Sequence, residues 1–221
     1  MTEQTQEKIR LLKQEFRANM NGVASTTMRN AGIGYRVNFG IELPRLQAIA
    51  REFEPDHELA QELWKEDVRE SKIVATLLQP VETFYPEIAD IWAESITTAE
   101  MAGIASMNLF QHLPYAVEKA FQWMASEHLY VQVCGYHTIF HLMRQGDLSD
   151  RLTEELVDHS LCTMSWPSNP FPLRDIAWKA LRQLAGLSES RGREVVVAMK
   201  DAGFDRTAEL RPYVEYLEGE V

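Results

Sequence analysis

The sequence predicts an all-α protein, an α-solenoid in which antiparallel helix pairs stack on one another. Apolar residues recur with a helical period through most of the chain, as in the stripe formed by Ile9, Leu12 and Phe16. No segment shows a sustained alternation of apolar and polar residues, so a central β-sheet is not expected. Prolines and glycines divide the chain into helices of roughly 10 to 17 residues, and their short connections make successive helices antiparallel neighbours.

The individual elements follow from this period and punctuation. The first helix is predicted over 7–20, and the glycine-rich residues 21–42 are predicted to form an extended connection. Pro44 suits the first turn of the next helix, where its missing N–H leaves no bond unmade, and Asp56 is a predicted N-cap. Further helices are predicted over 68–79, 84–96, 99–112, 115–126, 129–145, 149–163, 172–186, 190–202 and 206–218.

Three tryptophans hint at an internal repeat. Trp64, Trp92 and Trp123 are 28 and 31 residues apart, and each lies near the end of a predicted helix. Degenerate repeats of helix pairs that bury a shared core are typical of the HEAT type of solenoid. We therefore expect residues 1–221 to form one HEAT-like repeat domain in which these tryptophans are buried between successive pairs.

Composition and charge exclude several classes of protein. Apolar residues make up 45% of the 221, which excludes a disordered chain. The net charge of −11 opposes attraction of DNA or anionic membranes through the overall field. Two cysteines, Cys134 and Cys162, leave no room for a disulfide framework. The chain has no signal-like N-terminus and no apolar run of membrane-spanning length, so a cytoplasmic protein with no membrane partner and no cofactor is expected.

Cys134, His137 and His141 share one stripe of a predicted helix, and all three are residue types that bind zinc. The stripe lacks a glutamate between the histidines and has no evident carboxylate or cysteine partner. A packed helix with hydrogen-bonded histidines is therefore favoured, and no metal site is predicted.

The charges are unevenly distributed. Residues 83–162 carry 3 basic and 11 acidic residues, whereas residues 166–200 carry 6 basic and 3 acidic residues. The basic segment contains the DNA-binding candidates Arg174, Trp178, Lys179 and Arg182. Cations around an indole can hold a phosphate and stack on a base, but a core tryptophan flanked by arginines gives the same pattern. The acidic segment is a candidate docking surface for a protein partner.

Two segments carry a family resemblance. NFGIELPRLQAIAREF and DHELAQELWKEDVRESKIVATLL resemble the start of the DNA alkylation repair proteins built from HEAT-like repeats. The resemblance covers roughly 7–205, and its motif residues are Phe39, Gly40, Ile41, Pro44, Leu46, Glu62, Leu63, Trp64, Arg69 and Glu70. It implies a DNA glycosylase that excises N3- and N7-alkylated purines. A Trp and an Asp four residues later would face the lesion, and an Arg and a second Trp would complete the site.

The chain departs from this pattern at each catalytic position. The Trp and Asp positions fall at Ala99 and Gly103, and the Arg position falls at Val133. The second Trp position falls at Lys179, one residue from Trp178, and Glu100 is the nearest carboxylate to the lost Asp position.

We therefore expect a divergent member that lacks glycosylase activity or has very little, and that binds duplex DNA weakly. One alternative is a non-catalytic protein-interaction scaffold. Another is an enzyme with relocated chemistry at Glu100 or at His137 and His141.

Overall fold

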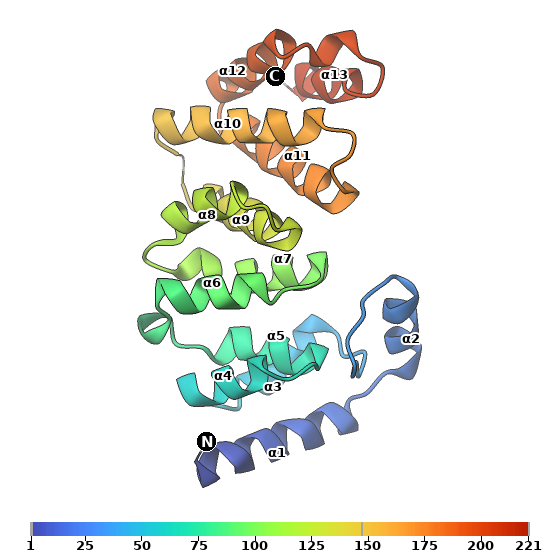
Figure 1. Ribbon diagram of the computed structural model, residues 1–221, viewed down its shortest axis with the longest axis vertical. Helices are drawn as coiled ribbons and strands as arrows, with labels where there is room; N and C mark the ends of the chain where they lie inside the picture. The colour runs from blue at the N-terminus through green and yellow to red at the C-terminus, as the bar shows by residue number, and fades with distance from the viewer. Residues whose placement is uncertain (1, 147, 221) are drawn as a thin grey trace. The chain divides into compact units, whose positions relative to one another are not determined.

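The computed structural model describes residues 2–146 and 148–220, and it confirms the all-α fold (Figure 1). Extended pairing in this part of the chain is limited to an isolated bridge between Val37 and Val68. The α-helices are α1 Glu3–Ala18, α2 Gly22–Asn30, α3 Leu43–Ala50, α4 His57–Trp64, α5 Arg69–Leu78, α6 Pro86–Glu94, α7 Ala99–Asn108, α8 Ala116–Met124, α9 Leu129–Met143, α10 Asp150–Ser165, α11 Phe171–Ala185, α12 Glu189–Asp201 and α13 Arg211–Glu220. Short 3₁₀ turns, η1 Val81–Thr83, η2 Phe110–His112 and η3 Phe204–Arg206, lie between some of them.

The extended connection expected over 21–42 is wrong in its first part, because α2 occupies Gly22–Asn30. Asn21 caps this helix by accepting a hydrogen bond from the backbone N–H of Ala24. Gly22 stands at the first helical position, where its flexibility costs less than in a helix interior. The glycines of this region therefore mark the ends of a short helix, and only residues 31–42 form the connection.

The chain divides into two compact units, Met1–Pro114 and Tyr115–Val221. In the first unit, α4 packs against α5, and α5 also contacts α3 and α7. The core of this unit contains the stacked indoles of Trp64 and Trp92, whose ring centroids are 4.1 Å apart with parallel planes. Trp64 is 5% exposed and Trp92 is 1% exposed, so α4 and α6 share a buried contact of the kind predicted from the spacing.

The second unit is built on the α8–α9 pair. Gly135 of α9 lets the two backbones meet, because a Cβ at this position would lie 2.6 Å from the carbonyl oxygen of Ala120 and 2.7 Å from the amide nitrogen of Met124. α9 and α10 both pack on α11, and α12 follows against α10, α11 and α13. Trp123 of α8 is 3% exposed, which confirms its predicted burial.

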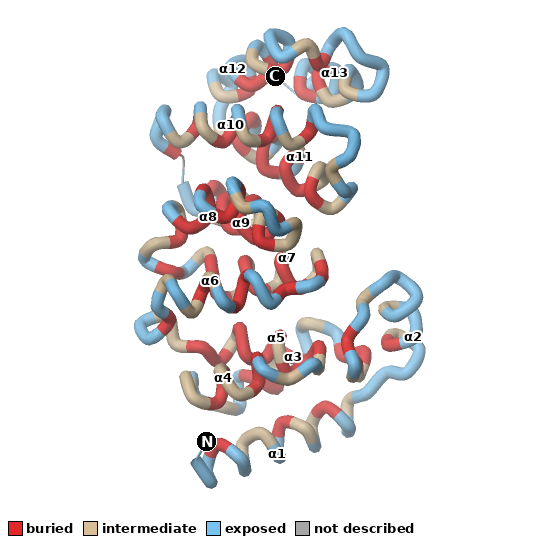
Figure 2. The backbone as a smooth tube through the Cα atoms, viewed as in Figure 1, coloured by how far each residue is buried: buried red, intermediate tan, exposed pale blue. Residues whose placement is uncertain are grey.

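Burial follows the helical period within each unit (Figure 2). In α11, for example, Leu173, Ile176, Ala180 and Leu184 are buried at helical spacing, while Arg182 on the same helix is exposed. None of the helices among the described residues is long and apolar enough to cross a membrane.

Candidate functional site

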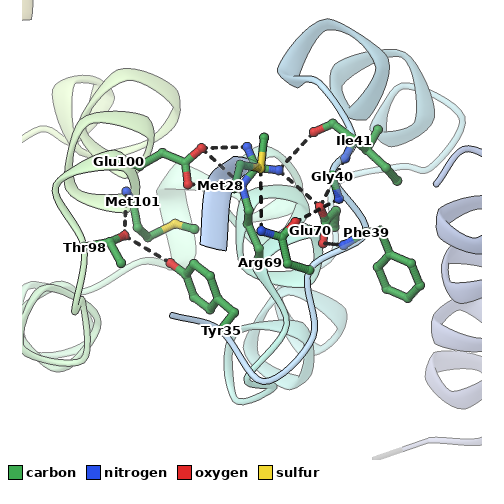
Figure 3. Close-up of polar contacts among 11 residues, drawn as sticks. Met28, Tyr35, Phe39, Gly40, Ile41, Arg69, Glu70, Thr98, Glu100 and Met101 are labelled. Atoms are coloured by element: carbon green, nitrogen blue, oxygen red, sulfur yellow. Dashed lines mark hydrogen bonds and ion pairs between the residues drawn. The ribbon is translucent and has the colours of Figure 1, made fainter. Parts of the chain in front are cut away.

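The Phe39–Ile41 turn of the first unit is held by a buried carboxylate. Oε2 of Glu70 accepts a hydrogen bond from the Phe39 amide at 3.0 Å, and Oε1 accepts one from the Ile41 amide at 3.3 Å (Figure 3). Gly40 lies between them at φ +72°, and a Cβ there would come within 2.3 Å of the carbonyl oxygen of Asn21. The turn therefore requires glycine, and Glu70 supplies the acceptor for its amides.

Arg69 joins this turn to α7. Its guanidinium donates to the Ile41 carbonyl at 2.9 Å and to Glu70 at 3.1 Å, and Nη2 donates to Oε1 of Glu100 at 2.7 Å (Figure 3). The side chain is 3% exposed, and Glu70 is fully buried. Burial lowers the pKa of Arg69, but the hydrogen bonds and charges of Glu100, and after them Glu70, outweigh burial and leave the pKa above its ordinary value. Arg69, Glu70 and Glu100 therefore form one charged cluster, the Arg69 clamp.

Glu100, the weak catalytic candidate, is committed to this clamp. Both carboxylate oxygens accept from Nε of Arg69, at 3.1 and 3.0 Å. Thr98 begins α7 by accepting a hydrogen bond from the Met101 amide. Ala99 and Gly103, one turn apart on α7, present no carboxylate and no indole. The carboxylate nearest the expected catalytic position thus braces two helices of the first unit.

In the second unit, the four DNA-binding candidates lie along α11, and each of them contacts another side chain of the protein. Nη1 of Arg174 donates to Glu209 at 2.7 Å. The ring of Trp178 lies 4.8 Å from that of Tyr213 and 5.8 Å from that of Tyr216, between centroids.

The remaining two candidates, Lys179 and Arg182, are the exposed cations of this set. Lys179 pairs with Asp175 at 2.6 Å, and the guanidinium of Arg182 lies 5.6 Å from the Tyr216 ring centroid. An exposed ion pair such as that of Lys179 and Asp175 is worth about 0 to 1 kcal/mol, so breaking it costs little. Trp178, by contrast, packs against Tyr213 and Tyr216 of α13 and is not fully exposed.

The remaining candidate positions lie on α9. Val133, at the expected arginine position, is fully buried and offers no surface. Cys134 is fully buried, and burial raises the pKa of its thiol. The rings of His137 and His141 are 6.4 Å apart, between centroids. Among residues 2–146 and 148–220, no three His, Cys, Asp or Glu side chains are grouped so that they could hold a metal ion.

His137 gives a prediction about acid stability. Burial, then the charges of His141 and Lys179, lowers its pKa from 6.5 to about 4, with Asp175 acting in the opposite direction. Because the folded-state pKa is below the unfolded-state value, this contribution to stability is complete above pH 6.5 and is lost as the pH falls towards 4. We expect wild-type protein to lose up to about 3 kcal/mol more over this range than a His137→Gln variant.

Urea denaturation at a series of pH values measures this difference. A His128→Gln variant is the control, because His128 is an exposed histidine of the same unit. Parallel pH profiles for wild type and His137→Gln would show that His137 does not resist protonation in the folded state.

Some of this geometry was not visible in the sequence. The Arg69–Glu100 contact joins residues 31 positions apart. In the sequence, the family motif marked Arg69 and Glu70 but did not indicate that Glu100 would be a partner. A cleft between α10 and α12, lined by Glu154, Asp158 and Glu194, was also missed, since its acids come from two helices.

The fold and this arrangement define a HEAT-like repeat protein, and comparison with known proteins gives its family. Residues 12–161 match the model of the DNA alkylation repair enzymes, and the chain belongs to that family. A solved structure described as one of "a new family of proteins related to the HEAT-like repeat DNA glycosylases with affinity for branched DNA structures" is similar. The TM-score is 0.78 at 15% identity, over 87% of this chain and 82% of that chain, and this likeness shows the shared fold. No curated protein matches the sequence significantly.

Proposed function

We propose that this protein is a DNA-binding member of the DNA alkylation repair family that does not excise alkylated purines at a useful rate. The observation that carries the proposal is the Arg69 clamp beside Ala99 and Gly103. Glu100, the carboxylate nearest in sequence to the expected catalytic position, is held by Arg69 at 2.7 Å. Its oxygens are therefore committed to the guanidinium and are not free to turn towards the positive charge that develops on the sugar during base release.

The magnitude of the missing stabilisation supports this proposal. Removing one preorganised group of this kind typically costs on the order of 10² to 10³ in rate. Here the indole and carboxylate expected on α7 are both replaced, by Ala99 and Gly103, and the arginine expected on α9 is replaced by the buried Val133. The side chains at these three positions therefore lack the groups that would lower the activation barrier of base release.

The DNA-binding half of the proposal rests on α11. Lys179 and Arg182 are exposed there, and Arg174 is held nearby by Glu209. With a net charge of −11 the whole chain repels phosphates, so we expect weak, salt-sensitive binding in the range of about 10⁻⁴ to 10⁻⁶ M for duplex DNA. The similar structure is described as having affinity for branched DNA, and we propose that branched DNA is preferred here too.

Base release tests the catalytic half. Wild-type protein is expected to release 3-methyladenine and 7-methylguanine from methylated DNA only at the spontaneous rate. Protein-dependent release that disappears in Glu100→Gln, with circular dichroism showing that the variant is folded, would overturn the proposal and favour relocated chemistry.

A fluorescence titration with labelled duplex and four-way junction DNA, at several salt concentrations, tests the binding half. Lys179→Ala/Arg182→Ala is expected to weaken binding to both. The control, Lys65→Ala/Arg51→Ala, removes two exposed cations of the first unit. Nanomolar duplex affinity, or equal losses in the two double variants, would contradict the assignment of the α11 face.

A second candidate function is that of a non-catalytic scaffold that binds another protein. The cleft between α10 and α12 favours it, because its lining includes three acidic side chains, Glu154, Asp158 and Glu194.

A further inference from the structure

The turn between α10 and α11 exposes two large aromatic side chains. The connection is exposed over most of its length (Figure 2), and there Trp166 is 61% exposed and Phe171, the first residue of α11, is 73% exposed. Neither ring lies against another aromatic ring of residues 2–146 and 148–220. Trp64, Trp92 and Trp123 are all buried, as is usual for rings of this size. Two such rings exposed within one short turn indicate a surface that binds a ligand.

The backbone of this turn is fixed by hydrogen bonds and prolines. The amide of Asn169 donates to the Trp166 carbonyl at 3.0 Å, and its Nδ2 donates at 2.9 Å to the carbonyl of Thr163 near the end of α10. Prolines, whose rings restrict φ, stand in and beside the turn at Pro167, Pro170 and Pro172. A ligand that contacts the two aromatic rings therefore orders little additional backbone, so little of the binding free energy is lost to conformational entropy.

The charge around the two rings favours an anionic ligand. From His159 to Arg174 the chain has no aspartate or glutamate, although 33 of its 221 residues are acidic. Phe171, Arg174 and Arg182 recur at i, i+3 and i+11 along α11, so they lie on one side of the helix. Arg182 is exposed, which places a cation on the same side of α11 as the exposed Phe171. Flat aromatic rings beside cations are the combination that binds single-stranded nucleic acid.

We propose that this turn binds unpaired bases of DNA, with Trp166 and Phe171 stacking on the faces of the bases while the cations of α11 hold the adjacent phosphates. The inference rests on the proposed DNA binding of α11, and it adds the class of substrate, a duplex with a single-stranded segment beside it. Bases inside an intact duplex are covered by their neighbours in the stack and do not reach the two rings. DNA that forks or branches offers uncovered bases, so a preference for such DNA follows from the stacking.

A fluorescence titration compares a forked DNA, which is a duplex ending in two single-stranded arms, with the fully paired duplex. Trp166→Ala/Phe171→Ala is expected to weaken binding of the forked DNA by about tenfold or more, since stacking of one base on an aromatic ring changes affinity by about 5- to 150-fold. Affinity for the paired duplex should change by less than about twofold. The salt dependence of forked-DNA binding should keep its slope, because no phosphate contact is removed.

A 2-aminopurine base in one single-stranded arm reports the contact directly, because its fluorescence falls when it stacks on an aromatic ring. Saturating wild-type protein is expected to quench this fluorescence, and saturating Trp166→Ala/Phe171→Ala protein is expected to leave most of it. The control is Tyr85→Ala/Ile91→Ala, which removes side chains that are 61% and 63% exposed from the first unit. Both double variants should keep the thermal midpoint of the wild type, since all four side chains are exposed.

Equal losses of forked-DNA affinity in the two double variants would overturn the inference. So would equal losses for forked and paired DNA, or quenching that persists without Trp166 and Phe171. A wild-type protein that binds paired DNA through Lys179 and Arg182, but binds forked DNA no more tightly, would overturn this inference alone. A protein that binds neither DNA would overturn the proposed function and this inference together.

Discussion

Replacing Glu70 with alanine is expected to lower the free energy of unfolding by about 2 to 5 kcal/mol, because two backbone amides of the Phe39–Ile41 turn lose their acceptor and Arg69 keeps only one of its two carboxylate partners, Glu100. Arg69 is 3% exposed and would lose its 3.1 Å contact with Glu70. The amides of Phe39 and Ile41 would lose their acceptor in the same step. Urea denaturation, with the slope m compared between variants, measures the change.

Glu82→Ala is the matched control, since Glu82 is an exposed glutamate of the same unit. Its effect should stay within about 0.5 kcal/mol. A Glu70→Ala protein as stable as Glu82→Ala would mean that Glu70 does not organise the turn.

Replacing Trp64 with alanine is expected to cost about 3 to 5 kcal/mol, because the cavity falls at a contact shared by two helices. The indole stacks on Trp92 at 4.1 Å, and its Nε1 donates to Ser95 at 2.9 Å. The ammonium of Lys72 lies 4.5 Å from the same ring centroid. Thermal denaturation measures the loss, which should extend to α6 as faster hydrogen exchange, since stacked repeats stabilise their neighbours.

Trp166→Ala is the comparison for this prediction, because Trp166 is 61% exposed. That truncation should change stability by no more than about 0.5 kcal/mol. Equal thermal midpoints for the Trp64 and Trp166 variants would contradict the buried stack.

The helical class and most helix positions could be predicted, because apolar spacing and proline punctuation are local signals. The helix predicted over 172–186 is observed at Phe171–Ala185, for example. The short helix α2 could not be predicted, because Asn21 and Gly22, which begin it, are residue types that are also typical of loops. The family resemblance named Arg69 and Glu70, and the structure gives each a bonding role that a motif does not contain.

The candidate sites were harder to predict, because side-chain partners come from distant segments. The α11 pattern of cations around Trp178 gave no sign that Tyr213 and Tyr216 would pack on the indole. The carboxylate at Glu100 was visible as the nearest acid, but its engagement by Arg69 depends on the packing of α5 against α7.

The backbone contact at Gly135 limits how the second unit can adapt to a ligand. With the Ala120 carbonyl 2.6 Å from where a Cβ would stand, α8 and α9 have no intervening layer of side chains at that point over which to slide. We therefore expect α8 and α9 to move together as one body, and we expect the helices α10 through α13, which carry the exposed cations of α11 and the acidic cleft, to make any adjustment to a ligand.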